Sequence, residues 1–269
     1  MILVNGQPEE SLAVSDRGLQ YGDGLFETIA MRQGQLEFLD AHLARLQTGC
    51  QRLAIPFNDW AILSQELNVL CRQHDAVVKV IITRGSGGRG YNPASCLSPT
   101  RIISVHPFPD YPPEQQTGVS IRLCQHRLAS QPRFAGLKHL NRLDQIVARA
   151  EWQDTTIAEG LLFDQKEQLI EGTMSNVFLV NNDILLTPAL DEAGVAGIMR
   201  AEIMSRAKAL AIDVHIKPLG LDDLLSADEV FLCNSVIGIW PVVQLQHPAT
   251  RWSYGPLTQA LQMALQQRN

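Results

Sequence analysis

The sequence predicts an α+β protein made of two domains. Its 269 residues are 45% hydrophobic and 19% charged, which suffices for one large core or two medium ones. Strand-like and helix-like segments mix without a regular βαβ repeat, which argues against a doubly wound sheet. Segment 107–118 holds four prolines and little to bury, as expected of a linker. We therefore expect a small N-terminal α+β domain over 1–113. A larger C-terminal α+β domain over 118–269 should carry the candidate lysine Lys138.

The first half should contain short strands and two helices. Leucines and a cysteine recur at positions 39, 43, 46, 50 and 53, the spacing of an apolar helical stripe, and Asp40 is a suitable N-cap. The run Val77-Val-Lys-Val-Ile-Ile is rich in β-branched residues and predicts a strand over 76–83. The other expected elements are strands at 1–4, 25–32, 35–38 and 101–106 and a helix at 60–72.

The second half should alternate strands with fewer helices. A turn at Lys138 should lead directly into a helix that ends near residue 153. Glu159 should begin a strand and be solvated. Gly194 and Gly197 precede a helix over 198–211. The other expected elements are strands at 119–124, 159–163, 177–180, 184–187, 214–217, 229–233 and 237–243, a helical turn at 221–225 and a C-terminal helix at about 255–267.

Composition and charge exclude several classes of partner. The net charge of −6 makes nucleic acid or an anionic membrane an improbable partner. No run approaches the ~18–20 apolar residues of a membrane span, and the first residues lack the features of a signal peptide. The cysteines are odd in number, scattered and without a CxxC pair, so we expect a reducing, cytoplasmic location without disulfides or a metal site; they are Cys50, Cys71, Cys96, Cys124 and Cys233.

The loop Gly85–Gly90 matches the pattern GxGxxG but is not a dinucleotide fingerprint. A fingerprint would open a helix at once, whereas Tyr91-Asn-Pro follows here. Two interpretations stay open. In one, Arg84 and Arg89 hold a carboxylate through paired hydrogen bonds. In the other, the segment is an ordinary hairpin loop with solvated arginines.

Three features together indicate pyridoxal chemistry. Lys138 lies beside Gly136 and Leu137, where partial burial would favour a nucleophilic amine, although a lysine before a helix is more often solvated. Glu171 precedes small residues and a buried strand, so its carboxylate would lie under a pocket floor. The helix start after Gly197 and the turn Cys233-Asn-Ser235 would offer N–H donors to an anion. A lysine for a Schiff base, a carboxylate for a pyridinium nitrogen and a phosphate cradle suggest pyridoxal 5′-phosphate.

Several motifs resemble the fold-type IV pyridoxal-phosphate enzymes. The resemblance runs in order through nearly the whole chain. It is carried by His42-Leu-Ala-Arg45-Leu, Lys138-His-Leu-Asn, Glu171-Gly-Thr-Met-Ser-Asn-Val-Phe, Gly194-Val-Ala-Gly-Ile-Met-Arg200 and Ala227-Asp-Glu-Val-Phe-Leu-Cys-Asn234. It implies a two-domain fold like that of D-amino acid aminotransferases, with the cofactor between the domains, and a homodimer.

The resemblance also implies residue roles. Lys138 would form the Schiff base and Glu171 would face the pyridine nitrogen. The phosphate would be bound by a set comprising Arg45, Ile198, Met199, Asn234 and Ser235. Thr28 is the candidate proton donor to a leaving oxygen, and the candidate substrate ligands are Arg89, Tyr91 and Arg142.

Within this family, the stretches Ser11–Gly18, Arg84–Tyr91 and Gly136–Leu143 are most similar to the lyases that convert 4-amino-4-deoxychorismate to 4-aminobenzoate and pyruvate in folate synthesis. Arg142 stands where branched-chain aminotransferases have a tyrosine. The alternative is an aminotransferase acting on D- or branched-chain amino acids. A scaffold without cofactor is a third, less favoured hypothesis, because the lysine, the acid and the arginine are all present.

Overall fold

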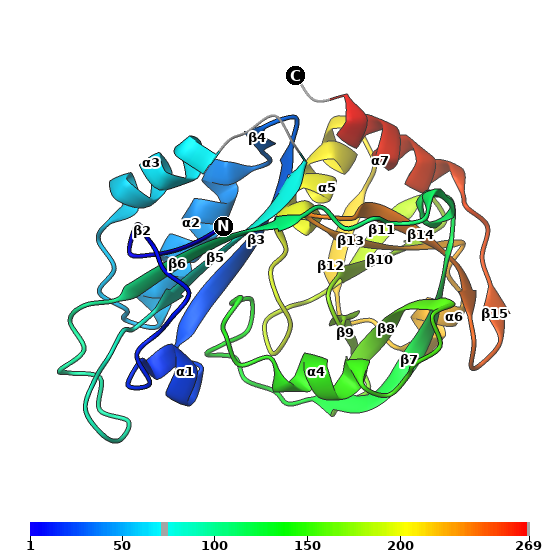
Figure 1. Ribbon diagram of the computed structural model, residues 1–269. Coiled ribbons are helices and arrows are strands. Elements are labelled where there is room, and N and C mark those ends of the chain that lie inside the picture. The colour runs from blue at the N-terminus through cyan, green and yellow to red at the C-terminus, as the bar shows by residue number, and fades with distance from the viewer. Residues whose placement is uncertain (71–74, 268–269) are drawn as a thin grey trace. The chain divides into compact units, whose positions relative to one another are not determined.

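The computed structural model describes residues 1–70 and 75–267 (Figure 1). The chain forms two compact units. The first unit comprises Met1–Asp110 and Leu137–Asn141, and the second comprises Tyr111–Gly136 and Arg142–Asn269. Cys71 and Arg72, the expected end of the second helix, lie outside the described residues. The mixed α and β content of both units agrees with the predicted α+β class.

The first unit is built on an antiparallel sheet. Within the described residues its strand order is β2-β1-β6-β5-β3-β4. The neighbouring strands β3 and β5 pair antiparallel from Gly24 to Met31, with Thr28 opposite Lys79 and Glu27 opposite Val80. The strands are β1 (Ile2–Val4), β2 (Gln7–Pro8), β3 (Gly24–Arg32), β4 (Gln35–Leu36), β5 (Ala76–Thr83) and β6 (Thr100–Pro107).

Two helices cover one face of this sheet, α2 (Leu39–Arg52) and α3 (Trp60–Leu70) (Figure 1). The predicted apolar stripe of α2 faces the core: Leu46 and Cys50 are buried, and the leucines at 39, 43 and 53 pack against the same cluster. The predicted N-cap was wrong by two residues. Phe38 caps the helix in a left-handed conformation and Asp40 lies in the first turn, where its charge still complements the helix dipole.

The segment around Lys138 belongs to the first unit, not to the C-terminal domain as the sequence predicted. Its backbone attaches to β3: the Phe26 N–H donates to the Lys138 carbonyl at 2.9 Å, and the Leu140 N–H donates to the Gly24 carbonyl at 3.0 Å. Leu137 is buried in the core of the first unit. Backbone pairing across such a distance in sequence has no local sequence signal.

The second unit contains a mixed sheet of nine strands within the described residues. Its main path is β12-β11-β10-β13-β14-β7-β8-β9, and β15 pairs with β14. The pairs β14·β7, β7·β8 and β11·β12 are parallel. The strands are β7 (Val119–Leu128), β8 (Ile157–Asp164), β9 (Leu169–Gly172), β10 (Asn176–Asn181), β11 (Ile184–Pro188), β12 (Val214–Lys217), β13 (Glu229–Asn234), β14 (Gly238–Leu245) and β15 (Thr250–Arg251).

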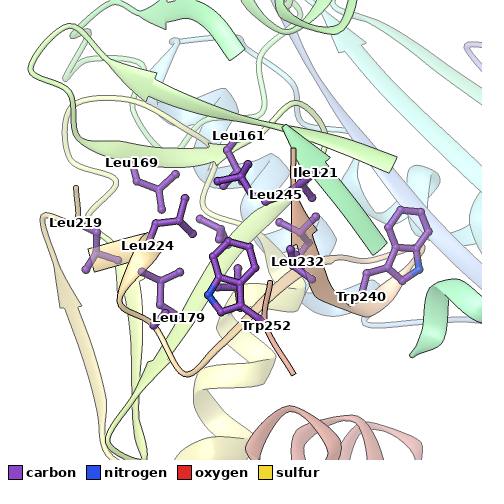
Figure 2. Packing of buried hydrophobic residues seen from close by; sticks show 14 of the residues in the cluster. Ile121, Leu161, Leu169, Leu179, Leu219, Leu224, Leu232, Trp240, Leu245 and Trp252 are labelled. Carbon is purple, nitrogen blue, oxygen red and sulfur yellow. The ribbon is translucent and has the colours of Figure 1, made fainter. Parts of the chain in front are cut away.

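A large apolar cluster forms the core of the second unit. Leucines from several strands surround Trp252, and Trp240 lies at one side of the cluster (Figure 2). The long helices α5 (Ile198–Ala209) and α7 (Pro256–Gln266) pack on each other and on β13. The shorter helical segments are η1 (Pro113–Gln116), α4 (Leu143–Arg149) and α6 (Leu221–Leu225).

Three local features differ from the sequence prediction. Helix α1 (Arg17–Tyr21) and strand β9 were not predicted, because each is too short to show a periodic pattern. Lys138 does not lead directly into a helix, since α4 begins only at Leu143 and already ends at Arg149.

The described cysteines are free and buried. None of the described helices is long and apolar enough to traverse a bilayer.

Candidate active site

Lys138 lies against the face of β3 that carries Phe26. Side chains alternate along a strand, and Leu25, Ile29 and Met31 point into the core beneath α2. Phe26 and Thr28 therefore point to the opposite face of the sheet. There the Lys138 ammonium lies 4.4 Å from the centroid of the Phe26 ring, and the lysine is half-buried. A half-buried lysine is better suited than a fully solvated lysine to provide a nucleophilic amine.

A second lysine shares this face. Lys79 pairs with Thr28 across the β3–β5 ladder, and its ammonium lies 5.3 Å from the centroid of the same Phe26 ring. The sequence analysis placed Lys79 in an apolar run and did not single it out. The strand period could have identified it, because its neighbours Val78 and Val80 are buried on the other face.

Arg45 is held by buried Glu27, which is in turn held by buried His42, and neither of these contacts was predicted from the sequence. Its Nε donates to Glu27 Oε1 at 2.8 Å, and its Nη2 donates to Glu27 Oε2. His42 Nδ1 lies 2.6 Å from Glu27 Oε2. Burial raises the pKa of Glu27, but the hydrogen bonds and charges of His42 and Arg45 outweigh burial and hold it below the ordinary value. Glu27 could have been identified from the sequence, because it alternates with Leu25 and Ile29 and so occupies a core-facing position of its strand.

The arginine Arg84 cannot bind a carboxylate ligand as one interpretation proposed. It is buried, and its guanidinium donates to Asp23 at 2.7 Å and to the carbonyls of Ala54 and Leu53. Burial raises the pKa of Asp23, but hydrogen bonds from Arg84 and Arg17 outweigh burial and lower it overall. Arg84 is therefore a structural residue.

The loop that carries Arg89 and Tyr91 is exposed and attached through its backbone. Both side chains are exposed. Arg17, itself buried, donates to the Gly90 carbonyl at 2.8 Å and to the Tyr91 carbonyl at 3.3 Å. The Tyr91 ring packs edge-on against Tyr21 at 5.5 Å between centroids. This loop is therefore anchored to α1 while its side chains stay accessible.

Glu171 occupies the end of β9 and is buried. Its Oε2 accepts a hydrogen bond from the Val195 N–H at 2.8 Å, and its Oε1 lies 3.4 Å from Gln145 Nε2. Burial lowers the pKa of Arg142, while the negative charges of Glu171 and Asp144 act in the opposite direction. Glu171 and Arg142 are thus brought into one electrostatic environment of the second unit. A buried acid of this kind can, in its ionised form, stabilise a protonated ring nitrogen.

Glu159 is buried, not solvated as predicted, with 1% of its surface exposed. Its carboxylate accepts hydrogen bonds from the backbone N–H groups of Thr173 and Met174 at 3.1 and 3.0 Å and from the hydroxyls of Thr173 and Ser175. Such a set of donors explains why a charged group is retained in the core. Glu159 thereby fixes the turn that follows Glu171.

Helix α5 begins where the sequence predicted a helix start suited to an anion. Gly197 is its N-cap and has no side chain that could accept from the first N–H groups, which include those of Ile198 and Met199. The turn after β13 is tightly built. Asn234 Oδ1 accepts from the Val236 and Ile237 N–H groups at 2.8 and 2.9 Å, so this side chain organises the turn itself. Ser235 next to it is partly exposed.

These residues have the chemistry that pyridoxal phosphate requires. The first unit contains an amine and a guanidinium. The second unit contains a buried carboxylate and the N-terminus of α5, a helix of twelve residues that begins after a glycine. Among the described residues, no cluster of histidine, cysteine and acidic side chains is arranged to hold a metal ion.

Comparison with known proteins identifies the family. The profile described as "Amino-transferase class IV" matches residues 24–245. The aminodeoxychorismate lyase of Vibrio harveyi is 39% identical over 97% of this chain and 98% of its own length. The crystal structure of 4-amino-4-deoxychorismate lyase from Pseudomonas aeruginosa is 50% identical, with a TM-score of 0.95 over 99% of this chain and 98% of its own. The D-alanine aminotransferase of Bacillus licheniformis is 29% identical over 98% of this chain and 95% of its own length. The chain therefore belongs to the class IV aminotransferase family.

Proposed function

We propose that this protein is a pyridoxal-phosphate-dependent lyase that converts 4-amino-4-deoxychorismate to 4-aminobenzoate and pyruvate. The observation that carries the proposal is the half-buried Lys138 amine beside Phe26, in a chain that is 50% identical to a lyase of this specificity along nearly its whole length. Thr28 lies on the same face of β3 as Phe26, two residues further along the strand. In this proposal Lys138 is the base and Thr28 the proton donor of an elimination.

The proposal assigns a residue to each part of the cofactor. Lys138 would bind it covalently and Glu171 would keep its ring nitrogen protonated. The phosphate ligands would be Arg45, Ile198, Met199, Asn234 and Ser235. When bound, pyridoxal phosphate supplies an electron sink for a carbanion next to the substrate nitrogen. In this proposal Asn234 acts mainly by shaping its turn, because its side-chain oxygen already accepts two N–H groups.

The chain's own residues would move two protons. Lys138 takes the proton from the ring carbon that bears the substrate nitrogen. The bond between the substrate ring and the enolpyruvyl ether oxygen then breaks, and Thr28 donates a proton to that oxygen. The released enol becomes pyruvate, and the six-membered ring becomes aromatic. No electrons are gained or lost overall, so the reaction needs no oxidant and no second substrate.

Cationic and hydroxyl side chains would hold the two carboxylates of the substrate. Arg89 and Tyr91 lie on the exposed loop, and Arg142 lies beside Glu171. Lys79 adds a further positive charge on the Phe26 face of the first unit. This amount of positive charge suits a dicarboxylate better than an amino acid with a single carboxylate.

The second candidate is an aminotransferase for D- or branched-chain amino acids. It is favoured by the family assignment and by the 29% identity to a D-alanine aminotransferase. Both activities use the same cofactor and the same lysine, and they differ after the first proton is removed. The lyase expels pyruvate, whereas the aminotransferase passes the amino group to a keto acid.

One experiment separates the two. Purified holoenzyme is incubated with 4-amino-4-deoxychorismate, without and with a keto acid such as 2-oxoglutarate, and 4-aminobenzoate and pyruvate are quantified. We expect equal amounts of both products without the keto acid and no stimulation by it. Product formation that requires the keto acid, or turnover of D-alanine at a much higher kcat/KM, would establish the aminotransferase instead.

We further propose a homodimer in the cytoplasm. The buried, free cysteines fit a reducing compartment. Exposed apolar side chains of α4, namely Leu143, Ile146 and Val147, are suited to contact a second copy. Light scattering should give twice the 29.8 kDa mass of the chain, and a mass of one chain would contradict the dimer.

A further inference from the structure

Glu27 is an acid in an apolar layer. It lies on the core-facing side of β3 between Leu25 and Ile29, and only 1% of its surface is exposed. Its backbone partner across the ladder is Val80, also buried. A carboxylate at such a position costs free energy unless charged or hydrogen-bonding groups accompany it. The structure shows which groups do so.

Both partners come from one turn of α2. His42 and Arg45 are three residues apart, so they project from the same side of the helix toward β3. His42 Nδ1 lies 2.6 Å from Glu27 Oε2, and Arg45 Nε lies 2.8 Å from Glu27 Oε1. Arg45 Nη2 donates to Oε2 as well, which makes the arginine contact bidentate. The lowered pKa of Glu27 agrees with an ionised carboxylate in this cluster.

The histidine adds a second contact to the Glu27 carboxylate. His42 is fully buried, and its Nδ1 lies next to Oε2, the oxygen that also accepts from Arg45 Nη2. The contacts with His42 and Arg45 together engage both oxygens of the carboxylate and fix its plane.

This arrangement orients the guanidinium. A guanidinium is planar, and its Nε–Nη2 edge is the one that Glu27 binds. With that edge fixed, the direction of the remaining Nη N–H groups is set by the plane of the Glu27 carboxylate. Arg45 retains 14% exposure of its side chain, whereas Glu27 and His42 are enclosed. A ligand can therefore approach Arg45 but not the two residues behind it.

We propose that Glu27 and His42 are positioning residues that hold Arg45 ready to bind the cofactor phosphate. The inference rests on the proposed role of Arg45 as a phosphate ligand. It predicts that Glu27 contributes to cofactor affinity through the phosphate group, because Glu27 is enclosed and acts on the cofactor through the guanidinium that it orients.

The test compares cofactors with and without phosphate. The dissociation constants of pyridoxal 5′-phosphate and of pyridoxal are measured on the apoenzyme by absorbance titration, for wild type and for Glu27→Gln. Glutamine keeps the shape of glutamate but cannot accept two charged donors equally. We expect Glu27→Gln to raise the dissociation constant of pyridoxal phosphate on the order of tenfold and to change that of pyridoxal by no more than about twofold.

The chain offers a matched control. Glu66 and Arg101 form a second bidentate pair in the first unit, with both contacts at 2.6 Å, and neither residue is proposed to bind the cofactor. Glu66→Gln should lower thermal stability as Glu27→Gln does, yet leave the ratio of the two dissociation constants unchanged. If Glu27→Gln does not fold, His42→Gln, which removes only one partner, should change the ratio in the same direction by a smaller factor.

Two results would overturn the inference itself, and a third would remove the role of Arg45 on which it rests. One is an equal loss of affinity for pyridoxal phosphate and for pyridoxal in Glu27→Gln. The other is a further loss of phosphate preference when Glu27→Gln is added to Arg45→Gln, since Glu27 would then act without the arginine. If Arg45→Gln alone leaves phosphate preference intact, the proposed role of Arg45 fails together with the inference. A lyase assay on wild type is independent of these outcomes and tests the proposed function separately.

Discussion

At the scale of single residues, β3 has a different chemistry on each of its faces. Core-facing Glu27 serves Arg45, and Thr28, the next residue, points to the face that carries Phe26. Lys138 and Lys79 approach that same ring from a docked segment and from the neighbouring strand. Alternation along one strand thus places Glu27 on the core side of the sheet and Thr28 on the side of Phe26.

The hydroxyl of Thr28 is expected to be required for the elimination and not for binding the cofactor. Thr28→Val keeps the β-branched shape but removes the proton donor, so kcat should fall by about 10²–10⁴-fold with an unchanged cofactor spectrum. Thr28→Ser restores a hydroxyl and should recover most of the activity. Steady-state kinetics of 4-aminobenzoate formation measure both variants, and a fully active Thr28→Val enzyme would exclude Thr28 as the donor.

Glu159 is expected to stabilise the turn that follows Glu171. Its carboxylate accepts from backbone and hydroxyl donors of residues 173–175, and glutamine would replace one acceptor oxygen by a donor. Glu159→Gln should reduce the free energy of unfolding by about 1–3 kcal/mol, measured by urea denaturation. Glu167→Gln, which alters the exposed pair with Arg127, is the control and should have little effect. Equal effects of the two substitutions would show that the turn does not depend on Glu159.

At the scale of secondary-structure elements, the contact between α2 and β3 is expected to be sensitive to acid. The pKa of Glu27 is lower in the folded protein than its ordinary value of 4.5. Its ion pair with Arg45 therefore stabilises the fold above about pH 4.5, and this contribution is lost as the pH falls through the folded-state pKa. The difference in unfolding free energy between wild type and Glu27→Gln should be about 3–5 kcal/mol at pH 7 and should shrink below pH 4.5. Urea denaturation across this pH range measures it, and a difference that is constant or grows in acid would contradict the account.

The N-terminus of α5 is expected to tolerate no side chain at its N-cap. A Cβ at Gly197 would lie 2.0 Å from the Asn176 Oδ1 atom, whereas a Cβ at Gly88 would meet nothing within 4 Å. Gly197→Ala should therefore displace the first turn of α5 and weaken binding of pyridoxal phosphate by about tenfold or more. Gly88→Ala is the control and should bind normally in the same titration. Normal binding by Gly197→Ala would show that this helix start does not contact the phosphate.

The periodic elements could be predicted from the sequence, and the irregular ones could not. The leucine spacing of α2 and the β-branched run of β5 have local signals, and both were found at the expected places. The attachment of Lys138 to β3 depends on hydrogen bonds between residues more than a hundred positions apart. Leu137 likewise packs in the core of the first unit against residues distant in the sequence. Such pairing has no period along the chain, so the domain containing Lys138 was assigned wrongly.

The same limit applied to the candidate site. Lys138, Arg45 and Glu171 could be named from motifs, because each lies in a short stretch typical of the family. The partners that fix them could not, since Glu27 meets Arg45, and Val195 meets Glu171, only after folding. The burial of Glu159 was not predicted for a related reason: its hydrogen-bond donors come from residues 173–175, in the turn after the neighbouring strand β9.

At the scale of the whole molecule, the chain divides the proposed chemistry between its two units. The first provides the lysine, the hydroxyl and the clamped arginine, and the second provides the buried acid and the helix N-terminus. Each group is stabilised within its own unit: Arg45 by Glu27, and Glu171 by the Val195 N–H.

The central claim is that Lys138 is the amine that binds the cofactor. Borohydride reduction of the holoenzyme, followed by proteolysis and mass spectrometry, would locate the attached pyridoxyl group among the five lysines. We predict that the added mass appears on the peptide containing Lys138 and disappears in Lys138→Ala. Attachment to Lys79, the other lysine beside Phe26, or to no lysine at all, would contradict the account.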